Sequence, residues 1–225
     1  MNPREIVDRA REKGLDIIAI TDHNSAENVE ATRRAAAGTG ITVWGGMEIA
    51  SSEEVHVLAL FEGQEALGCM QDVIYDSLPV RENDEKDYGD QVIVNEFKEV
   101  MGFNRRLLIA ATGLNARRIL EVIASLGGLS IASHIDRQAF SVLSQLGFIP
   151  EDLRFNALEL SPNASRAWAE SRFASLRGFP WVSFSDAHQV ADIGRRATIF
   201  LMKEPTLDEM RQALLGSEGR NVIWE

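Results

Sequence analysis

Short apolar runs alternate with helix-like segments along most of this 225-residue chain. The first run, residues 15–20, follows a helix that Asn2 and Pro3 are expected to begin. Later runs fall at residues 41–44, 55–61, 129–133, 157–160, 181–184 and 197–201. Runs that are apolar on both faces are typical of buried parallel strands, and their alternation with helices favours a parallel sheet or a barrel. We therefore expect an α/β fold and a single domain over residues 1–225.

One stretch departs from this alternation. Residues 64–77 are expected to form a helix, residues 79–90 are charged and loop-like, and residues 91–109 alternate in a way that predicts a β-hairpin. The hairpin is expected to be an insertion into the barrel.

The composition limits the partners and the compartment. The net charge is −11, from 23 basic and 34 acidic residues, whereas binding along a phosphate backbone needs clustered Lys and Arg. We therefore expect nucleic acid to be a poor partner. No apolar run approaches the roughly 20 residues of a membrane span. Cys69 is the only cysteine, which fits a reducing compartment, so we expect a cytoplasmic protein.

The four histidines lie close to the expected strands. His23, His134 and His188 come at or just after strand ends, in the contexts Thr-Asp-His, Ala-Ser-His and Ser-Asp-Ala-His. His56 opens its strand instead, a position that would face the opposite end of a parallel barrel. Either its strand begins earlier, or the chain enters there from above the site.

Carboxylates follow the same expected strands. Glu48 follows residues 41–44, Glu159 lies at the end of residues 157–160, and Asp186 follows residues 181–184. In a β/α barrel the carboxyl ends of the strands converge on one mouth, where His, Asp and Glu form a ligand set suited to zinc, manganese or iron. The alternative is structural, since a single histidine near a strand end is more often a hydrogen-bonded residue and Asp22 and Asp186 can be turn residues.

These segments resemble the motifs of the PHP (polymerase and histidinol phosphatase) family. The matching segments, in order, are Ile20-Thr21-Asp22-His23-Asn24, Gly46-Met47-Glu48-Ile49, Val55-His56-Val57-Leu58, Ala132-Ser133-His134 and Ser185-Asp186-Ala187-His188. The resemblance implies a distorted TIM-like (β/α)7 barrel with up to three divalent metal ions at one mouth. It also implies hydrolysis of phosphomonoesters or phosphodiesters.

The resemblance also assigns the ligands. Glu48 would bridge two metals, with His56 and His134 completing one site and Asp186 contributing to the other. His23 and His188 would hold the third metal. Zn, Mn and Fe are all compatible with such ligands.

The family's first motif, an Asp-x-His-x-His segment on strand one, has no counterpart in this sequence. We therefore expect a barrel without its first strand, weak metal loading and low activity. A start at an internal methionine or a cut chain is favoured over natural loss of the motif. Exposed strand edges in an unclosed barrel could drive homo-oligomer formation.

The expected mechanism is attack of metal-activated water on a phosphate ester. Glu48 and Asp186 are the predicted catalytic carboxylates. Arg137 is the first candidate for gripping a substrate phosphate and Arg195 the second, because a guanidinium matches phosphate bidentately; either could instead be a surface salt-bridge residue. His23 or His188 could donate a proton to the leaving group if its metal is absent.

Three functions follow from these patterns. The leading hypothesis is a metal-dependent phosphoesterase acting on a small phosphorylated metabolite or nucleotide. The second is a degenerate, non-catalytic PHP domain that serves as a binding or regulatory module. The third is an amidohydrolase-like enzyme acting on C–N bonds, against which the Thr-Asp-His-Asn and Ser-Asp-Ala-His contexts speak.

Overall fold

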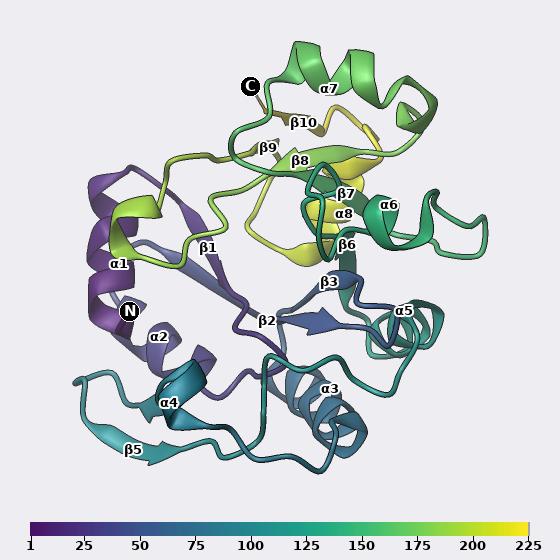
Figure 1. Cartoon of the computed structure of the whole chain (residues 1–225). Helices are drawn as coiled ribbons and strands as arrows, with labels where there is room; N and C mark the ends of the chain where they lie inside the picture. The colour runs from purple at the N-terminus through teal and green to yellow at the C-terminus, as the bar shows by residue number, and fades with distance from the viewer. Residues whose placement is uncertain (225) are drawn as a thin grey trace.

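A six-stranded sheet, curled into a partial barrel, forms the centre of the computed structural model, which describes residues 1–224 (Figure 1). In spatial order its strands are β1 (Ile17–Ile20), β2 (Thr42–Ala50), β3 (His56–Phe61), β6 (Leu129–Ala132), β7 (Ala157–Leu160) and β8 (Trp181–Ser183). The α/β fold of a distorted TIM-like barrel is therefore confirmed.

One strand of the sheet departs from the parallel arrangement that the alternation of strands and helices favours. β3 runs antiparallel to both of its neighbours, β2 and β6, whereas β1–β2, β6–β7 and β7–β8 are parallel pairs. A short connection, residues 51–55, joins β2 to β3, and only a reversal of direction can be made over so few residues.

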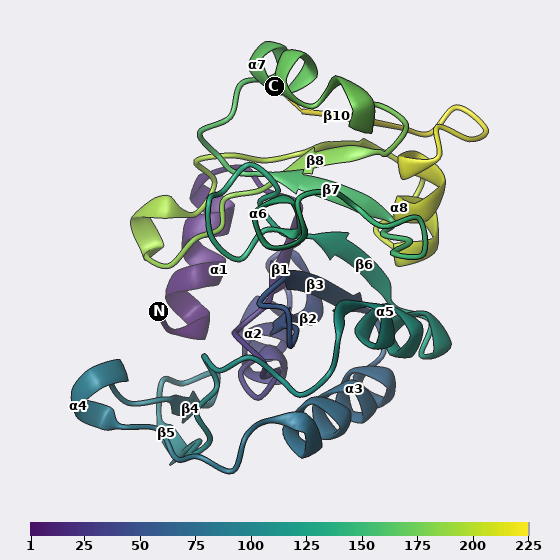
Figure 2. The ribbon, with the colours of Figure 1, turned by 45° about the vertical axis from the view of Figure 1, so that its right-hand side comes forward.

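Helices cover the outer face of the sheet (Figure 2). They are α1 (Pro3–Glu12), α2 (Val29–Ala36), α3 (Gln64–Ser77), α5 (Ala116–Ser125), α6 (Val142–Leu146) and α7 (Arg166–Arg172), the last followed by the 3-10 turn η1 (Ala174–Leu176). The helix expected at residues 64–77 is confirmed. At the start of α1, the Asn2 side chain accepts a hydrogen bond from the Glu5 backbone N–H at 3.1 Å, as the sequence predicts.

The inner face of the sheet is apolar at one end and polar at the other. Trp44, Leu60 and Leu129 pack there against α8 (Leu207–Leu214), which closes the inner face at that end. Further along the same faces lie Glu48 on β2 and His56 on β3, both buried. A single curled sheet thus has a packed apolar base and a polar mouth.

The β2–β3 contact requires glycine close to the mouth. A Cβ on Gly46 would collide with the Ala59 carbonyl oxygen of β3. Gly46 therefore allows the close approach of the two strands that carry Glu48 and His56.

The expected insertion is present. β4 (Val92–Val94) and β5 (Val100–Phe103) form an antiparallel hairpin, which confirms the hairpin predicted for residues 91–109. It is anchored to α2 through Asn28, whose side-chain oxygen accepts from the Val94 backbone N–H at 3.0 Å. The preceding segment is not only loop, because a four-residue helix, α4 (Glu85–Tyr88), lies within it.

The chain ends in a second small sheet. β9 (Ile199–Leu201) confirms the strand expected at residues 197–201, and it pairs antiparallel with β10 (Asn221–Ile223), a strand that the sequence patterns do not predict. A 3-10 turn, η2 (Val190–Asp192), lies between β8 and β9. Within residues 1–224, no helix combines the length and apolarity needed to cross a bilayer.

Candidate metal centre

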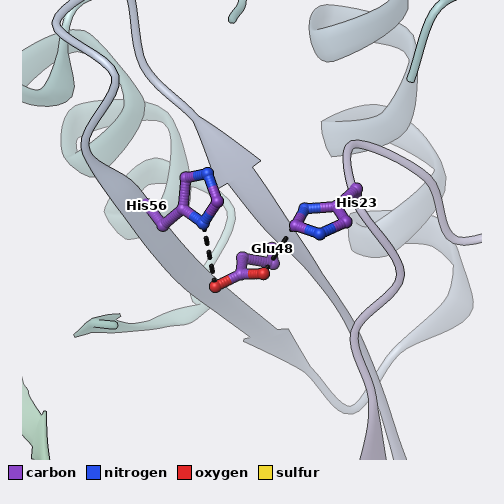
Figure 3. A group of neighbouring side chains, drawn as sticks. All are labelled: His23, Glu48 and His56. Carbon is purple, nitrogen blue, oxygen red and sulfur yellow. Dashed lines mark ion pairs between the residues drawn. The ribbon is translucent and has the colours of Figure 1, made fainter. Parts of the chain in front are cut away.

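Three imidazoles surround one buried carboxylate at the mouth of the curled sheet. The Glu48 side chain is only 9% exposed. Its Oε2 lies 3.4 Å from His23 Nδ1, while its Oε1 lies 3.2 Å from His56 Nδ1 and 3.3 Å from His134 Nε2. Figure 3 shows the His23 and His56 rings on either side of the Glu48 carboxylate.

The strand directions explain why these residues meet. His23 follows β1 and forms a bridge with Glu48, whose backbone N–H donates to the Asp22 carbonyl at 3.1 Å. His134 follows β6. His56 opens β3, and because β3 is antiparallel its first residue lies beside the last residues of β2. Of the two expected explanations, the second holds: β3 begins at His56 and no earlier, and the chain enters it from the mouth because the strand is reversed.

The electrostatics favour an ionised Glu48. Burial opposes its ionisation, yet the close imidazoles of His134 and His56 hold the pKa of Glu48 well below its usual range. Burial lowers the pKa of His23, an effect that the Glu48 carboxylate partly offsets. The arrangement therefore favours neutral imidazole at His23 beside an anionic carboxylate, which are the protonation states of metal ligands.

The same residues fit a divalent metal ion. One ligand atom each from His23, Glu48 and His56 lies within 4.8 Å of the others. Among the described residues the buried His134 Nδ1 has no hydrogen-bond partner, and His56 Nδ1 contacts Glu48 Oε1 at 3.2 Å without the geometry of a hydrogen bond. Imidazole nitrogens and a carboxylate that are buried together form a donor set suited to Zn, Mn or Fe.

Asp186 and His188 lie beside this cluster, and their ion-pair contacts within the described residues are with Arg137 and with each other rather than with Glu48. Asp186 has a left-handed backbone (φ +45°), and its carboxylate pairs with the Arg137 guanidinium. His188 is 65% exposed, and its Nδ1 lies 3.2 Å from the Asp186 carbonyl oxygen. Its ring centroid is 6.4 Å from that of His23.

The two candidate arginines lie after β6 and β8. The Arg137 side chain is 41% exposed and contacts Asp186. Arg195 donates from Nε to the Ser185 carbonyl at 2.8 Å, and its Nη1 lies 3.4 Å from Asp192 Oδ1. Arg195 is thus engaged by its own loop, whereas Arg137 contacts a residue of the predicted ligand set.

Two further residues contact the cluster: Glu159, which the sequence analysis places at a strand end without giving it a role, and Phe140, which it does not name. Glu159, at the end of β7, is 3% exposed and accepts a hydrogen bond from the His134 backbone N–H; burial raises the pKa of its carboxyl to about 8. The strand-end position of Glu159 was the available signal. Phe140 stacks on His56 with ring centroids 4.7 Å apart, and nothing in the sequence pattern indicates this contact.

Known proteins agree with the fold and with the family expected from the sequence. The sequence profile of the PHP domain matches residues 1–137, more than half of the chain, and a PHP-associated profile matches residues 168–218. The fold is shared with a protein that contains a predicted PHP-like metal-dependent phosphoesterase. The chain belongs to the PHP domain family.

Solved structures with this fold include the lesion-specific endonuclease PfuEndoQ from Pyrococcus furiosus. It is 18% identical, with a TM-score of 0.72 over 99% of this chain and 53% of its own. Endonuclease Q in complex with a 27-mer duplex substrate bearing an abasic lesion gives 19% identity and a TM-score of 0.70, over 98% of this chain and 53% of its own. A two-domain protein of Bacteroides vulgatus that contains a predicted PHP-like metal-dependent phosphoesterase gives 18% identity and a TM-score of 0.55, over 99% of this chain and 60% of its own.

Among curated proteins, the uncharacterized YqxK of Bacillus subtilis is 29% identical over 120 residues, which are 51% of this chain and 30% of YqxK. The chain thus spans about half the length of endonuclease Q and less than a third of YqxK.

Proposed function

We propose that this protein hydrolyses phosphate esters with divalent metal ions held by the cluster of Glu48, His23, His56 and His134. The observation that carries the proposal is the buried Glu48 carboxylate within 3.4 Å of three imidazoles. Zn, Mn and Fe remain the candidate ions, and His188 and Asp186 are proposed as ligands of further ions. A bound divalent ion supplies an activated water and neutralises charge on phosphoryl oxygens.

The chain's own residues have distinct proposed roles. Glu48, through its low pKa, stays anionic at neutral pH and holds the ligand set together. Asp186 pairs with Arg137 and thereby orients the guanidinium, whose remaining N–H donors are accessible enough to grip a substrate phosphate. Arg195, bonded to the Ser185 carbonyl, is the weaker candidate for that role.

The proposed substrate is a small phosphorylated metabolite or a nucleotide. The acidic net charge of −11 supports a small substrate over a long nucleic acid. The likeness to endonuclease Q, solved with a duplex substrate, supports a nucleic acid lesion as the second candidate. The expectation that nucleic acid is a poor partner therefore stays a prediction.

We further infer one domain, because β1–β3 and β6–β8 belong to the same sheet although the two family profiles match separate stretches. A cytoplasmic location and a homo-oligomer also stay predictions, supported by the single cysteine and by the two edge strands β1 and β8.

The test uses the purified protein stripped with EDTA and reloaded with Zn, Mn or Fe. Phosphate-ester hydrolysis is measured on a phosphomonoester, a phosphodiester, a nucleoside monophosphate and a duplex with an abasic site, with Glu48→Gln as the ligand-deficient variant. Metal-dependent hydrolysis that Glu48→Gln abolishes would support the proposal, and the preferred substrate would separate the two candidates. Metal binding without hydrolysis of any of the four would favour the non-catalytic module.

A further inference from the structure

His134 is held in an unusual backbone conformation. Its φ is +29°, in a region that non-glycine residues rarely adopt. Such a conformation costs on the order of 1–3 kcal/mol and persists only where surrounding contacts fix it. Something next to His134 must therefore fix the turn that follows β6.

Residues at the end of β7 supply those contacts. The Glu159 carboxylate accepts from the His134 backbone N–H at 3.2 Å, and the Glu159 carbonyl accepts from the Ile135 backbone N–H at 2.8 Å. Two residues on, the Asp136 carboxylate accepts from the Ser161 backbone N–H at 2.7 Å and from its hydroxyl at 2.6 Å. Four hydrogen bonds thus fasten the turn to β7.

The His134 ring has no comparable support of its own. Its Nε2 faces Glu48 Oε1 at 3.3 Å, but its buried Nδ1 has no partner among the described residues. Metal-binding histidines are generally oriented by a hydrogen bond from the ring nitrogen that does not face the ligand site. Since His134 lacks one, its orientation depends on the backbone.

We propose that Glu159 is the positioning residue of His134: its carboxylate, by accepting the His134 backbone N–H, holds the imidazole toward Glu48. This inference rests on the proposed function, because it assigns a role within the same metal centre. Glu159 is 3% exposed, so water cannot replace it as acceptor. The property that matters is the position of an acceptor oxygen rather than the carboxylate charge.

The structure provides a matched control at the other end of the same two strands. The Asn156 side-chain oxygen accepts from the Ser130 backbone N–H at 2.8 Å, so it also fastens β6 to β7. Asn156 contacts none of the ligand residues through this bond. Asn156→Ala therefore removes side-chain hydrogen bonds between β6 and β7, those from the Ser130 backbone N–H and hydroxyl, at an exposed position away from His134.

The experiment is a Co²⁺ titration of the metal-stripped protein, followed by visible absorption, with thermal unfolding of each variant as the measure of folding. Glu159→Ala and Glu159→Asp are expected to weaken Co²⁺ binding by about 10–100-fold, the effect typical of outer-shell partners. Glu159→Gln keeps an acceptor oxygen at the same reach and is expected to bind within about threefold of wild type, as is Asn156→Ala.

Each outcome bears on the proposal. Wild-type affinity in Glu159→Asp would overturn it, and this variant serves even if Glu159→Ala fails to fold. Equal weakening in Glu159→Gln and Glu159→Ala would also overturn it, because an acceptor oxygen at the same reach would then not be enough to hold His134. Absence of Co²⁺ binding by the wild type would overturn the proposed metal centre itself, and with it this inference.

Discussion

Two buried carboxylates, Glu48 at the mouth and Glu209 on α8 at the closed base, have opposite surroundings. Glu209 is bound by Arg220 through two hydrogen bonds, at 3.1 and 2.7 Å, and also accepts from the Lys203 backbone N–H at 2.8 Å. Glu48 is instead surrounded by three imidazoles at 3.2–3.4 Å, and the buried Nδ1 of one of them, His134, has no partner among residues 1–224.

The difference separates a structural ion pair from a ligand site. Both carboxyls have a lowered pKa, Glu209 because of its hydrogen bonds with Arg220 and Glu48 because the imidazoles outweigh the effect of burial. At the base, each partner supplies what the other needs, so the pair is complete within the chain. At the mouth, donor atoms converge without satisfying one another, which is the condition for binding an ion.

The largest expected effect comes from removing the central ligand. Glu48→Gln should weaken divalent metal binding by about 100-fold or more, beyond the effect of an outer-shell change. Isothermal titration with Zn²⁺ or Mn²⁺ would measure it. Glu209→Gln is the matched control at the base and should leave metal affinity unchanged. If both variants lost metal equally, the distinction between the two carboxylates would be wrong.

Arg220→Ala is expected to lower stability and to leave metal binding unchanged. This change leaves Glu209 buried without its guanidinium partner, so the melting temperature should fall by several degrees. Metal stoichiometry, measured by elemental analysis of the folded protein, should stay the same. A loss of metal at unchanged melting temperature would contradict a purely structural role.

Acid should weaken the base pair in a defined pH range. The pKa of Glu209 is lowered from 4.5 to about 2, so its contribution to stability is present above pH 4.5 and is lost as the pH falls toward 2. The difference in urea midpoint between wild type and Glu209→Gln should therefore shrink over that range. A difference that is independent of pH would show that Glu209 does not titrate in this way.

His188→Ala is expected to have the smallest effect. Its ring is 65% exposed, and its Nδ1 contacts Asp186 rather than Glu48. Affinity for the first metal equivalent should change by less than about fivefold, as for loss of an exposed contact of under ~1 kcal/mol. A larger loss in a Zn²⁺ titration would place His188 in the primary ligand set.

The sequence predicted the positions of the strands better than their directions in the sheet. Apolar runs located each strand of the six-stranded sheet because a buried strand needs apolar residues on both faces. They could not show that β3 is antiparallel, since the same pattern fits either direction. His56 was the only sign of the reversal, as a histidine at the wrong end of a strand.

The site was predicted as a set of residues but not as a geometry. The clustering of His23, Glu48, His56 and His134 follows from strand ends converging on one mouth. The stacking of Phe140 on His56 and the turn conformation of His134 depend on contacts between segments far apart in the chain. No local pattern records such contacts.

The reversal of β3 also has a consequence for the order of folding. Glu48 and His56 are eight positions apart in the sequence and lie on a hairpin, so their meeting closes only a short loop and costs little chain entropy. His23 and His134 reach them only after longer loops have closed. We therefore expect the Glu48–His56 contact, the most local of the cluster, to form before those of His23 and His134.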